Sequence, residues 1–213
     1  MARDVIQPGR HGKAGANSVE IWGDRISGNC LKVQWIADRL GLQHRWIDVD
    51  ILAGDTRSPA FLAMNPAGQV PLVRWPDGRT LAQSNAILLH LAEGSALIPA
   101  DAFTRAKMLE WLFWEQYSHE PAVAVARFRV LYQGQSPDDL DPALLAKCAA
   151  ALTRLEAGVA DGFLVGRRLS LADVALVAYT RMAGDAGLSL DPFPAIRRWI
   201  GLVEAELGLP PYR

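Results

Sequence analysis

Two nearby segments of the sequence have residue types that suit the binding of a short acidic peptide. Pro71 follows Gln69-Val70 at the start of an apolar, strand-like run. Because proline cannot donate a ladder hydrogen bond, this position favours a cis Val70–Pro71 bond that leaves the Val70 backbone free to pair with an extended ligand. Gln83-Ser84 follows where a strand ends and a helix begins, and helix-start N–H groups favour a carboxylate. Together the segments predict a site for a peptide with an acidic end.

A third candidate is the loop Ile26-Ser27-Gly28-Asn29-Cys30, which follows the first strand-like run. Ser27 and Asn29 can donate hydrogen bonds to an anion near a helix N-terminus, where the dipole also favours negative charge. The alternative interpretation is that both side chains only cap the helix. Cys30 competes with them, since a helix start lowers the pKa of a thiol, but a cysteine there often only packs in the core. Cys148, in an apolar helical pattern, is expected in the core.

The elements that must position these residues fall into two parts. Residues 19–99 alternate strand-like and helix-like runs in the order β-α-β, an irregular linker, then β-β-α. From residue 101 onward the strand signals disappear, and three capping signals precede apolar helical patterns: Asp101, Asp141-Pro142 and Ser170 with Asp173. We expect an α/β domain over 19–99, an all-helical domain over 101–213, and a flexible tail without an assignable role over residues 1–18.

Several residues indicate where the predicted helices and strands begin, end or bend. Gly41 is expected to end the first helix, and Pro76-Asp77-Gly78-Arg79 is expected to join two strands as a hairpin, because glycine readily adopts positive φ. Ser84 is expected to cap the helix that follows the second of these strands. The long helix after Asp101 is expected to bend near Pro121.

The composition narrows the classes of function. The chain of 213 residues carries 22 basic and 23 acidic side chains, which gives no electrostatic reason to expect a nucleic acid or an anionic membrane as partner. The two cysteines lack metal-ligand spacing and the four histidines do not cluster, so no metal site is expected. Residues 1–18 contain no apolar run, and no segment approaches the roughly 18 apolar residues of a membrane span. We therefore expect a cytoplasmic protein.

A resemblance to a known family rests on two stretches: Asn65-Pro66-Ala67-Gly68-Gln69-Val70-Pro71-Leu72 and Leu81-Ala82-Gln83-Ser84-Asn85-Ala86-Ile87. Both closely resemble the glutathione site of cytosolic glutathione transferases. The loop around Ser27 resembles that of the serine-type classes and their bacterial theta- and nu-like relatives. The resemblance implies a thioredoxin-like, glutathione-binding domain followed by an all-α domain that accepts an electrophile.

The resemblance also implies how glutathione is held. Val70, which precedes the cis Pro71, would pair with its cysteinyl part through the backbone, and Gln69 and Pro71 belong to the same glutathione-binding segment. Gln83 and Ser84 would hold the γ-glutamyl carboxylate and amine, with Gln83 standing where the family usually has Glu.

Two further groups of residues take roles from the same resemblance. Ser27, with Asn29 as a second donor, would stabilise the glutathione thiolate. Three residues lie in loops that border the glycine carboxylate in similar proteins: Arg25, Thr56 and Arg57.

The electrophile pocket is expected along the long helix of the second part. An aromatic and polar cluster there includes Arg127 and Phe128, and family analogy indicates Trp114, Tyr117 and His119 as the residues that line the pocket. A packing role is the alternative for this cluster, and above all for His119.

The function expected from the resemblance is conjugation of glutathione, as co-substrate, to an apolar electrophile by a homodimer. A glutathione-dependent disulfide reductase or peroxidase is an alternative, and its cysteine-based version would use Cys30. A non-enzymatic binding or adaptor protein with the same fold is the second alternative.

Overall fold

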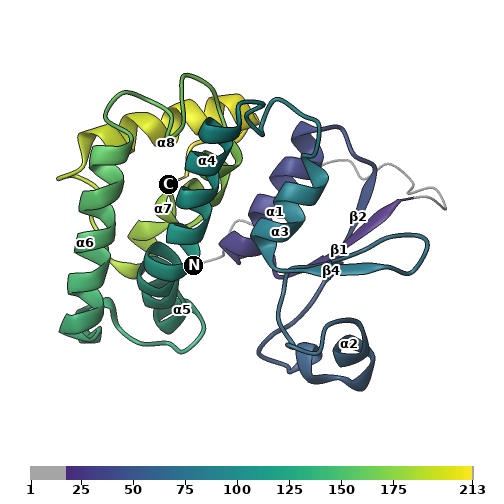
Figure 1. Ribbon diagram of the computed structural model, residues 1–213. Coiled ribbons are helices and arrows are strands. Elements are labelled where there is room, and N and C mark those ends of the chain that lie inside the picture. The colour runs from purple at the N-terminus through teal and green to yellow at the C-terminus, as the bar shows by residue number, and fades with distance from the viewer. Residues whose placement is uncertain (1–17, 213) are drawn as a thin grey trace.

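The computed structural model describes residues 18–212 as a sheet domain beside a helical domain (Figure 1). The predicted tail therefore lies, apart from Ser18, outside the described residues. The sheet has four short strands: β1 (Val19–Gly23), β2 (His44–Asp48), β3 (Leu72–Arg74) and β4 (Thr80–Ala82). Their order is β2-β1-β3-β4, with β1 parallel to β2 and antiparallel to β3. This mixed sheet, followed by a helical domain, confirms the predicted fold class.

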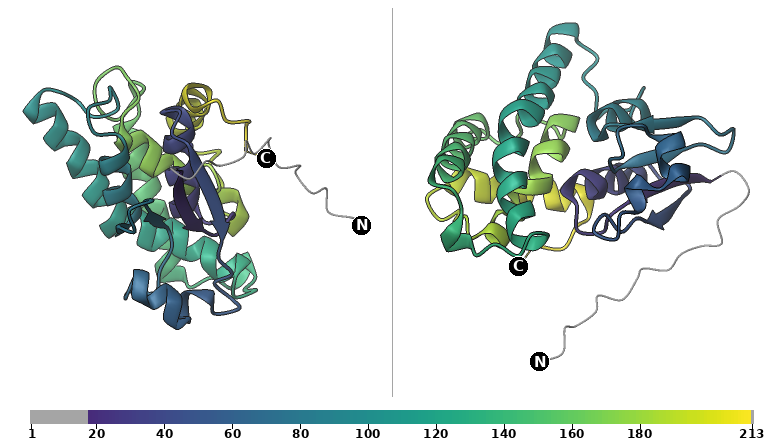
Figure 2. Two further views of the ribbon diagram at one scale, coloured as in Figure 1. Left: turned by 90° about the vertical axis from the view of Figure 1, so that its right-hand side faces the viewer. Right: turned by 90° about the horizontal axis from the view of Figure 1, so that it is seen from below.

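Three helices belong to the sheet domain: α1 (Gly28–Arg39), α2 (Pro59–Met64) and α3 (Ser84–Leu91). Helices α1 and α3 lie between the sheet and the helical domain, whereas α2 lies apart from that interface (Figures 1 and 2). The short 3₁₀ helix η1 (Asp55–Arg57) precedes α2. Gly41, just after α1, and Gly78, in the β3–β4 hairpin, both have positive φ, as the sequence predicted.

The start of α3 differs by one residue from the prediction. The helix begins at Ser84, and Gln83 occupies the N-cap position with φ 70° and ψ 109°. The positive φ of Gln83 turns the chain sharply out of β4. Ser84 is therefore already the first helical residue, whereas the sequence predicted it as the cap residue before the helix. The Ser84 hydroxyl consequently does not cap the helix; it donates a 3.0 Å hydrogen bond to Asn29 Oδ1 of α1.

The helical domain contains five α-helices: α4 (Ala102–Trp114), α5 (Val125–Leu131), α6 (Pro142–Gly158), α7 (Leu171–Thr180) and α8 (Pro194–Leu207). Two short 3₁₀ helices, η3 (Pro137–Asp139) and η4 (Ala183–Ala186), connect them. The predicted caps are present: Asp101 accepts from the Thr104 amide and Asp141 from the Ala143 amide, each at 2.8 Å. These caps satisfy backbone donors that a helix start leaves unpaired.

Between α4 and α5 the chain winds as a π-helix, η2 (Glu115–Ala124), which contains Pro121. Proline has no N–H and its ring collides with the carbonyl four residues earlier, so a regular α-helix cannot pass through this point. The wider i→i+5 winding accommodates it. The sequence predicted a bend near Pro121, and the structure has a change of helical winding there.

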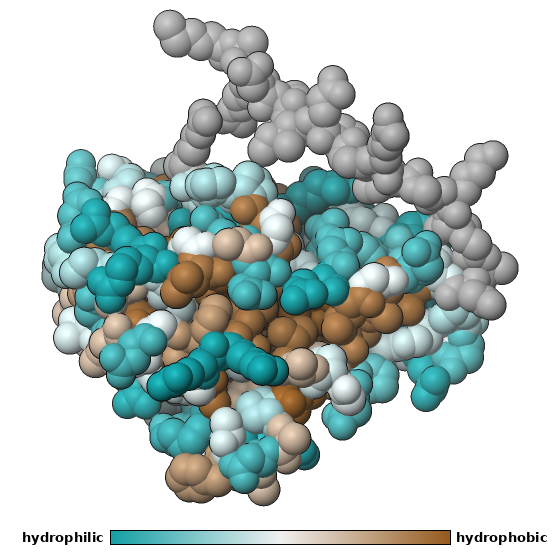
Figure 3. All heavy atoms as spheres, turned by 90° about the horizontal axis from the view of Figure 1, so that it is seen from above, coloured by the Kyte–Doolittle hydropathy of each residue, from teal (hydrophilic) through white to brown (hydrophobic). Residues whose placement is uncertain are grey.

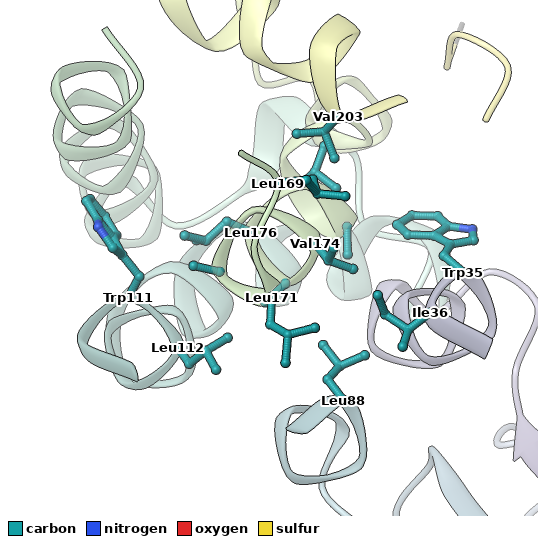
Figure 4. Packing of buried hydrophobic residues seen from close by; sticks show 14 of the residues in the cluster. Trp35, Ile36, Leu88, Trp111, Leu112, Leu169, Leu171, Val174, Leu176 and Val203 are labelled. Atoms are coloured by element: carbon teal, nitrogen blue, oxygen red, sulfur yellow. The ribbon is translucent and has the colours of Figure 1, made fainter. Parts of the chain in front are cut away.

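The hydrophobic core is centred on α7, whose ten residues are all buried. Figure 4 shows this helix surrounded by side chains of its neighbours: Ile36 of α1, Leu88 of α3, Leu112 of α4 and Val203 of α8. A helix that is apolar on all sides must be enclosed, so α7 joins the two domains into one core. On the face seen in Figure 3, apolar residues form a central band, consistent with the partly buried side chains at the margin of this core. Among residues 18–212, no helix has the length and apolarity to cross a membrane.

A buried ion pair also joins the domains. Lys32 Nζ of α1 lies 3.2 Å from Glu115 Oε1 of η2, and both side chains are fully buried. Asn85 of α3 and the neighbouring Gln116 donate to Glu115 Oε2 at 2.9 and 2.7 Å. These donors fix the carboxylate and, with it, the start of the π-helical segment.

We expect Lys32→Met to lower the free energy of unfolding by about 3–5 kcal/mol, because it leaves the Glu115 charge buried without its partner. Denaturant unfolding monitored by circular dichroism measures this loss. The matched control is Lys107→Met, which breaks a solvent-exposed pair with Glu110 and should not change the midpoint measurably. Glu115→Gln, added to Lys32→Met, should restore part of the stability. Equal effects of the two single changes would contradict a role for the buried pair.

Candidate functional site

A cavity of about 720 Å³ lies where the two domains meet. The sheet domain contributes most of the predicted binding residues to its wall: Ser27, Asn29, Thr56, Arg57, Gln69, Val70, Pro71, Gln83 and Ser84. The helical domain contributes the opposite side: Gln116, Glu120, Ala124, Arg127, Phe128, Tyr132 and Tyr179. The structure thus brings together the three sequence segments singled out above, which are separated by up to about sixty residues.

Ser27 stands immediately before α1, in extended conformation, and its side chain makes no capping hydrogen bond. Its Oγ lies 3.5 Å from the hydroxyl oxygen of Tyr179 and on the cavity wall. The capping interpretation of this serine is therefore not realised in the structure. A hydroxyl that is not used by its own helix remains available to a ligand in the cavity.

Asn29 connects three elements around the cavity. Its Oδ1 accepts from Ser84 Oγ of α3 at 3.0 Å, and its Nδ2 donates to Glu120 Oε1 of η2 at 3.4 Å. Burial is the main cause that raises the pKa of Glu120, and the nearby Glu115 charge adds to it. The Asn29 amide group therefore ties the start of α1 to both halves of the site.

The loop before β3 has the geometry that the sequence predicted. The Val70–Pro71 peptide bond is cis, and both residues line the cavity. Asn65 holds the loop: its Nδ2 donates to the Gln69 carbonyl at 2.7 Å and its Oδ1 accepts from the Ala67 amide at 3.2 Å. Because this bracing uses backbone groups of the loop, it sets how the Gln69-Val70 backbone faces the cavity.

Arg57 also reaches the cavity, and it passes directly over Gly68. A Cβ at Gly68 would collide with the Arg57 guanidinium, and Gly68 also has positive φ. The positive φ favours glycine at this position, and the absence of a side chain lets Arg57 lie close to the backbone. Thr56 lines the cavity beside it, whereas Arg25 does not and instead pairs with Asp48 at 2.6 Å.

The wall supplied by the helical domain is mixed in polarity. The rings of Phe128 and Tyr132 stack with centroids 4.7 Å apart. Arg127 is buried and committed to other groups: its Nε donates to Asp185 at 2.7 Å and its Nη1 to the Ile26 carbonyl. This arginine ties α5 to the Ser27 loop and adds positive charge beside the cavity.

The three residues expected to line the electrophile pocket are not on this wall. Tyr117 is 87% exposed to solvent. His119 is fully buried, with Nε2 2.9 Å from Thr180 Oγ1, and burial lowers its pKa to about 4. Trp114 packs at the edge of the core. Family analogy indicated these three residues, whereas Gln116 and Glu120 of the π-helical segment η2 line the cavity.

Cys30 is fully buried, does not line the cavity, and has a pKa raised to about 12, chiefly by burial. Cys148 is buried in the core, as predicted. Among the residues that the structure describes, no three histidine, cysteine or acidic side chains group as metal ligands would.

Tyr179 is the residue that sequence reasoning missed most completely. It is the penultimate residue of the apolar helix α7, yet it lines the cavity. The sequence feature that could have indicated its role is the hydroxyl group. A buried tyrosine hydroxyl needs a hydrogen-bond partner, so a tyrosine at the end of an otherwise apolar helix predicts a polar group nearby.

Comparisons with known proteins match both parts of the chain. Residues 26–93 match the family model of the glutathione S-transferase N-terminal domain, and residues 108–206 match that of the C-terminal domain. Glutathione S-transferase 3 of Zea mays is 31% identical, over 73% of this chain and 73% of its own. Maleylacetoacetate isomerase of Pseudomonas aeruginosa is 31% identical, over 78% of this chain and 82% of its own. The crystal structure of a glutathione S-transferase from Pseudomonas fluorescens has 42% identity and a TM-score of 0.84, covering 88% of this chain and 94% of that one.

We expect Cys30 to resist alkylation in the folded protein. A pKa of about 12, against an ordinary value of 9.0, lowers the thiolate fraction at neutral pH about a thousandfold, and burial blocks access as well. Iodoacetamide labelling followed by mass spectrometry tests this, with urea-unfolded protein as the reactive control. Rapid labelling of Cys30 in the folded state would restore it as a candidate nucleophile.

Proposed function

Since the chain belongs to the glutathione S-transferase family, we propose that it binds glutathione in this cavity and catalyses attack of the glutathione sulfur on an electrophile. One observation carries the proposal. A single cavity collects Val70 beside a cis proline, Ser84 at the start of α3, and a Ser27 hydroxyl that its own helix does not use.

The peptide would lie along the wall of the sheet domain. Its γ-glutamyl carboxylate would meet the N–H groups at the start of α3, where the helix N-terminus favours negative charge, and the Ser84 hydroxyl would turn its proton from Asn29 to this ligand. Its cysteinyl backbone would pair with Val70. Arg57, braced on Gly68, would attract the carboxylate at the glycine end. This arrangement orients the peptide with its sulfur toward the start of α1.

The sulfur would then be activated by Ser27, with Asn29 as a second polar group. A free thiol has a pKa near 8.5 and is mostly protonated at neutral pH, so donors that favour the thiolate raise the concentration of the nucleophile. The thiol proton leaves to solvent. The thiolate forms a carbon–sulfur bond, and the electrophile either loses its leaving group with the bonding electron pair or, in an addition, gains a proton.

The electrophile would occupy the side supplied by η2 and α5. Its apolar surface would meet Ala124 and the stacked rings of Phe128 and Tyr132. Gln116 and Glu120 give this wall a polar margin, so a substrate with an apolar body and one polar group fits best. The exposed side chains of Phe103, Phe113 and Tyr117 supply apolar surface for the homodimer that is typical of the family.

A second candidate function is glutathione-dependent isomerisation. The 31% identity to a maleylacetoacetate isomerase favours it. An isomerase returns free glutathione, whereas a transferase consumes it. Mass spectrometry of the products, alongside a thiol assay, separates the two. The burial of Cys30 argues against a cysteine-based reductase.

We expect Ser27→Ala to lower kcat/KM about 10- to 100-fold and to change the Kd for glutathione only a few-fold. The reason is that a hydrogen bond to a charged group contributes about 1.5–3 kcal/mol, here to the thiolate and not to the peptide backbone. Isothermal calorimetry with glutathione, and turnover of a generic aryl halide and a hydroperoxide, measure both quantities.

Ser136→Ala is the matched control for that change, because Ser136 caps the short helix η3 outside the cavity and should leave kcat/KM unaltered. Failure of the wild-type protein to bind glutathione would overturn the proposed site and favour a non-enzymatic protein. Binding without turnover would leave the site and remove the transferase activity.

We expect Gln83→Glu to tighten glutathione binding roughly fivefold at low ionic strength, since a carboxylate adds charge attraction to the hydrogen bond with the ligand's ammonium group. The gain should shrink as salt is added. Calorimetry at two salt concentrations provides the measurement. Unchanged or weaker binding would indicate that Gln83 does not face the ammonium group.

A further inference from the structure

The hydroxyl of Tyr179 reaches the start of α1 from the other domain. The Asn29 backbone N–H donates to it at 3.3 Å, and Ser27 Oγ lies 3.5 Å away. Tyr179 belongs to α7, is almost fully buried, and lines the cavity. The hydroxyl therefore lies between the proposed sulfur-stabilising serine and the backbone of the helix that follows it.

The direction is fixed for one of these hydrogen bonds. A backbone N–H can only donate, so the Asn29 contact uses the acceptor capacity of the Tyr179 oxygen. That contact leaves the phenolic proton available, and Ser27 Oγ is an oxygen within reach that can accept it. At 3.5 Å this contact is at the long end of hydrogen-bond distances. With its oxygen accepting from Tyr179, the Ser27 hydroxyl keeps its own proton for the cavity.

The ring of Tyr179 is held in this position by a contact that only glycine permits. A Cβ on Gly28 would lie 2.9 to 3.0 Å from three ring carbons of Tyr179, closer than real side-chain contacts. The ring thus packs directly on the backbone between Ser27 and Asn29. Gly28 has ordinary helical geometry, so close approach of the ring explains the need for a glycine here.

We propose that Tyr179 is a positioning residue, whose hydroxyl donates to Ser27 and thereby directs the Ser27 proton at the sulfur of the bound substrate. The resulting chain runs from the Asn29 N–H to the Tyr179 O–H, then to the Ser27 O–H and the sulfur. Each bond in such a chain polarises the next and strengthens the last. The proposal rests on the proposed function, because it requires a thiolate in front of Ser27.

Other titratable groups surround this hydroxyl. Glu120 of η2 and Cys30 of α1 both act on Tyr179 through their charges, and Tyr132 of α5 lies near enough to be affected by it. Burial raises the pKa of Tyr179 to about 12, so it remains a protonated donor at neutral pH. Burial, and next the Glu115 charge, raise the pKa of Glu120 above its ordinary value. A Glu120→Gln background therefore removes its contribution to any pH profile.

The test compares wild type, Tyr179→Phe, Ser27→Ala and the double variant, with the pKa of bound glutathione read from ultraviolet thiolate absorbance against pH. Tyr179→Phe should raise the pKa of the bound thiol by about one unit, and kcat/KM below that pKa should fall about tenfold. The Kd for glutathione should stay within about twofold, since the phenol does not hold the peptide. In the Ser27→Ala background, Tyr179→Phe should have no further effect.

Opposite results are equally specific. A lower thiol pKa in Tyr179→Phe would overturn the proposal, because it would show that the phenol withdraws the Ser27 proton from the sulfur. An unchanged thiol pKa would overturn it too. So would an effect of Tyr179→Phe that adds to the effect of Ser27→Ala. Tyr117→Phe is the matched control, because the Tyr117 side chain is 87% exposed and does not line the cavity. If Tyr179→Phe does not fold, Gly28→Ala displaces the ring and should raise the thiol pKa in the same way. Wild-type protein without glutathione binding would instead sink the proposed function itself.

Discussion

The carboxylate of Asp173 is fully buried and accepts four hydrogen bonds at 2.8 to 2.9 Å. The donors are the Ser170 amide and hydroxyl, the Leu164 amide and the Trp199 indole N–H. These bonds fix the start of α7, the incoming loop and α8 relative to one another. Without them the polar groups would be buried unpaired, which costs about 1–3 kcal/mol each. The position of the central helix, and of everything packed on it, depends on this one carboxylate.

A fixed α7 has consequences at its other end. Its apolar residues pack against α1 and α3 of the sheet domain and α4 and α8 of its own, so the helix cannot shift without opening the core. Its last two residues then present hydroxyls at defined places: Tyr179 over the start of α1, and Thr180 at the buried His119. The same helix that joins the domains also completes the site, which makes the docking of the domains part of the proposed chemistry.

Local chemistry explains why much of the fold and half of the site could be predicted from sequence. Caps such as Asp101 and Asp141, the glycine of the hairpin, and the cis Pro71 act within a few residues of themselves, so a short segment contains their whole physical cause. The start of α3 was misplaced by one residue because the positive φ of Gln83 is not a preference of glutamine. Nothing in the local sequence therefore signals that the helix begins directly after Gln83.

The other half of the site was not predictable in the same way, because its geometry comes from a change in helical winding. From Glu115 to Ala124 the chain is π-helical. The side of the helix on which a residue lies can therefore not be predicted there from the 3.6 residues per turn of an α-helix. Pro121 signals a disturbance but not its size, and the buried Lys32–Glu115 pair that anchors the segment joins residues far apart in sequence. The two walls are therefore built on different elements, which the Lys32–Glu115 pair joins. The side proposed for glutathione depends on α1, α3 and α7, and the side proposed for the electrophile depends on η2 and α5. Substitutions in η2 and α5 that spare the Asn29–Glu120 and Arg127–Ile26 contacts can thus alter what the cavity accepts while the sulfur-activating group stays in place.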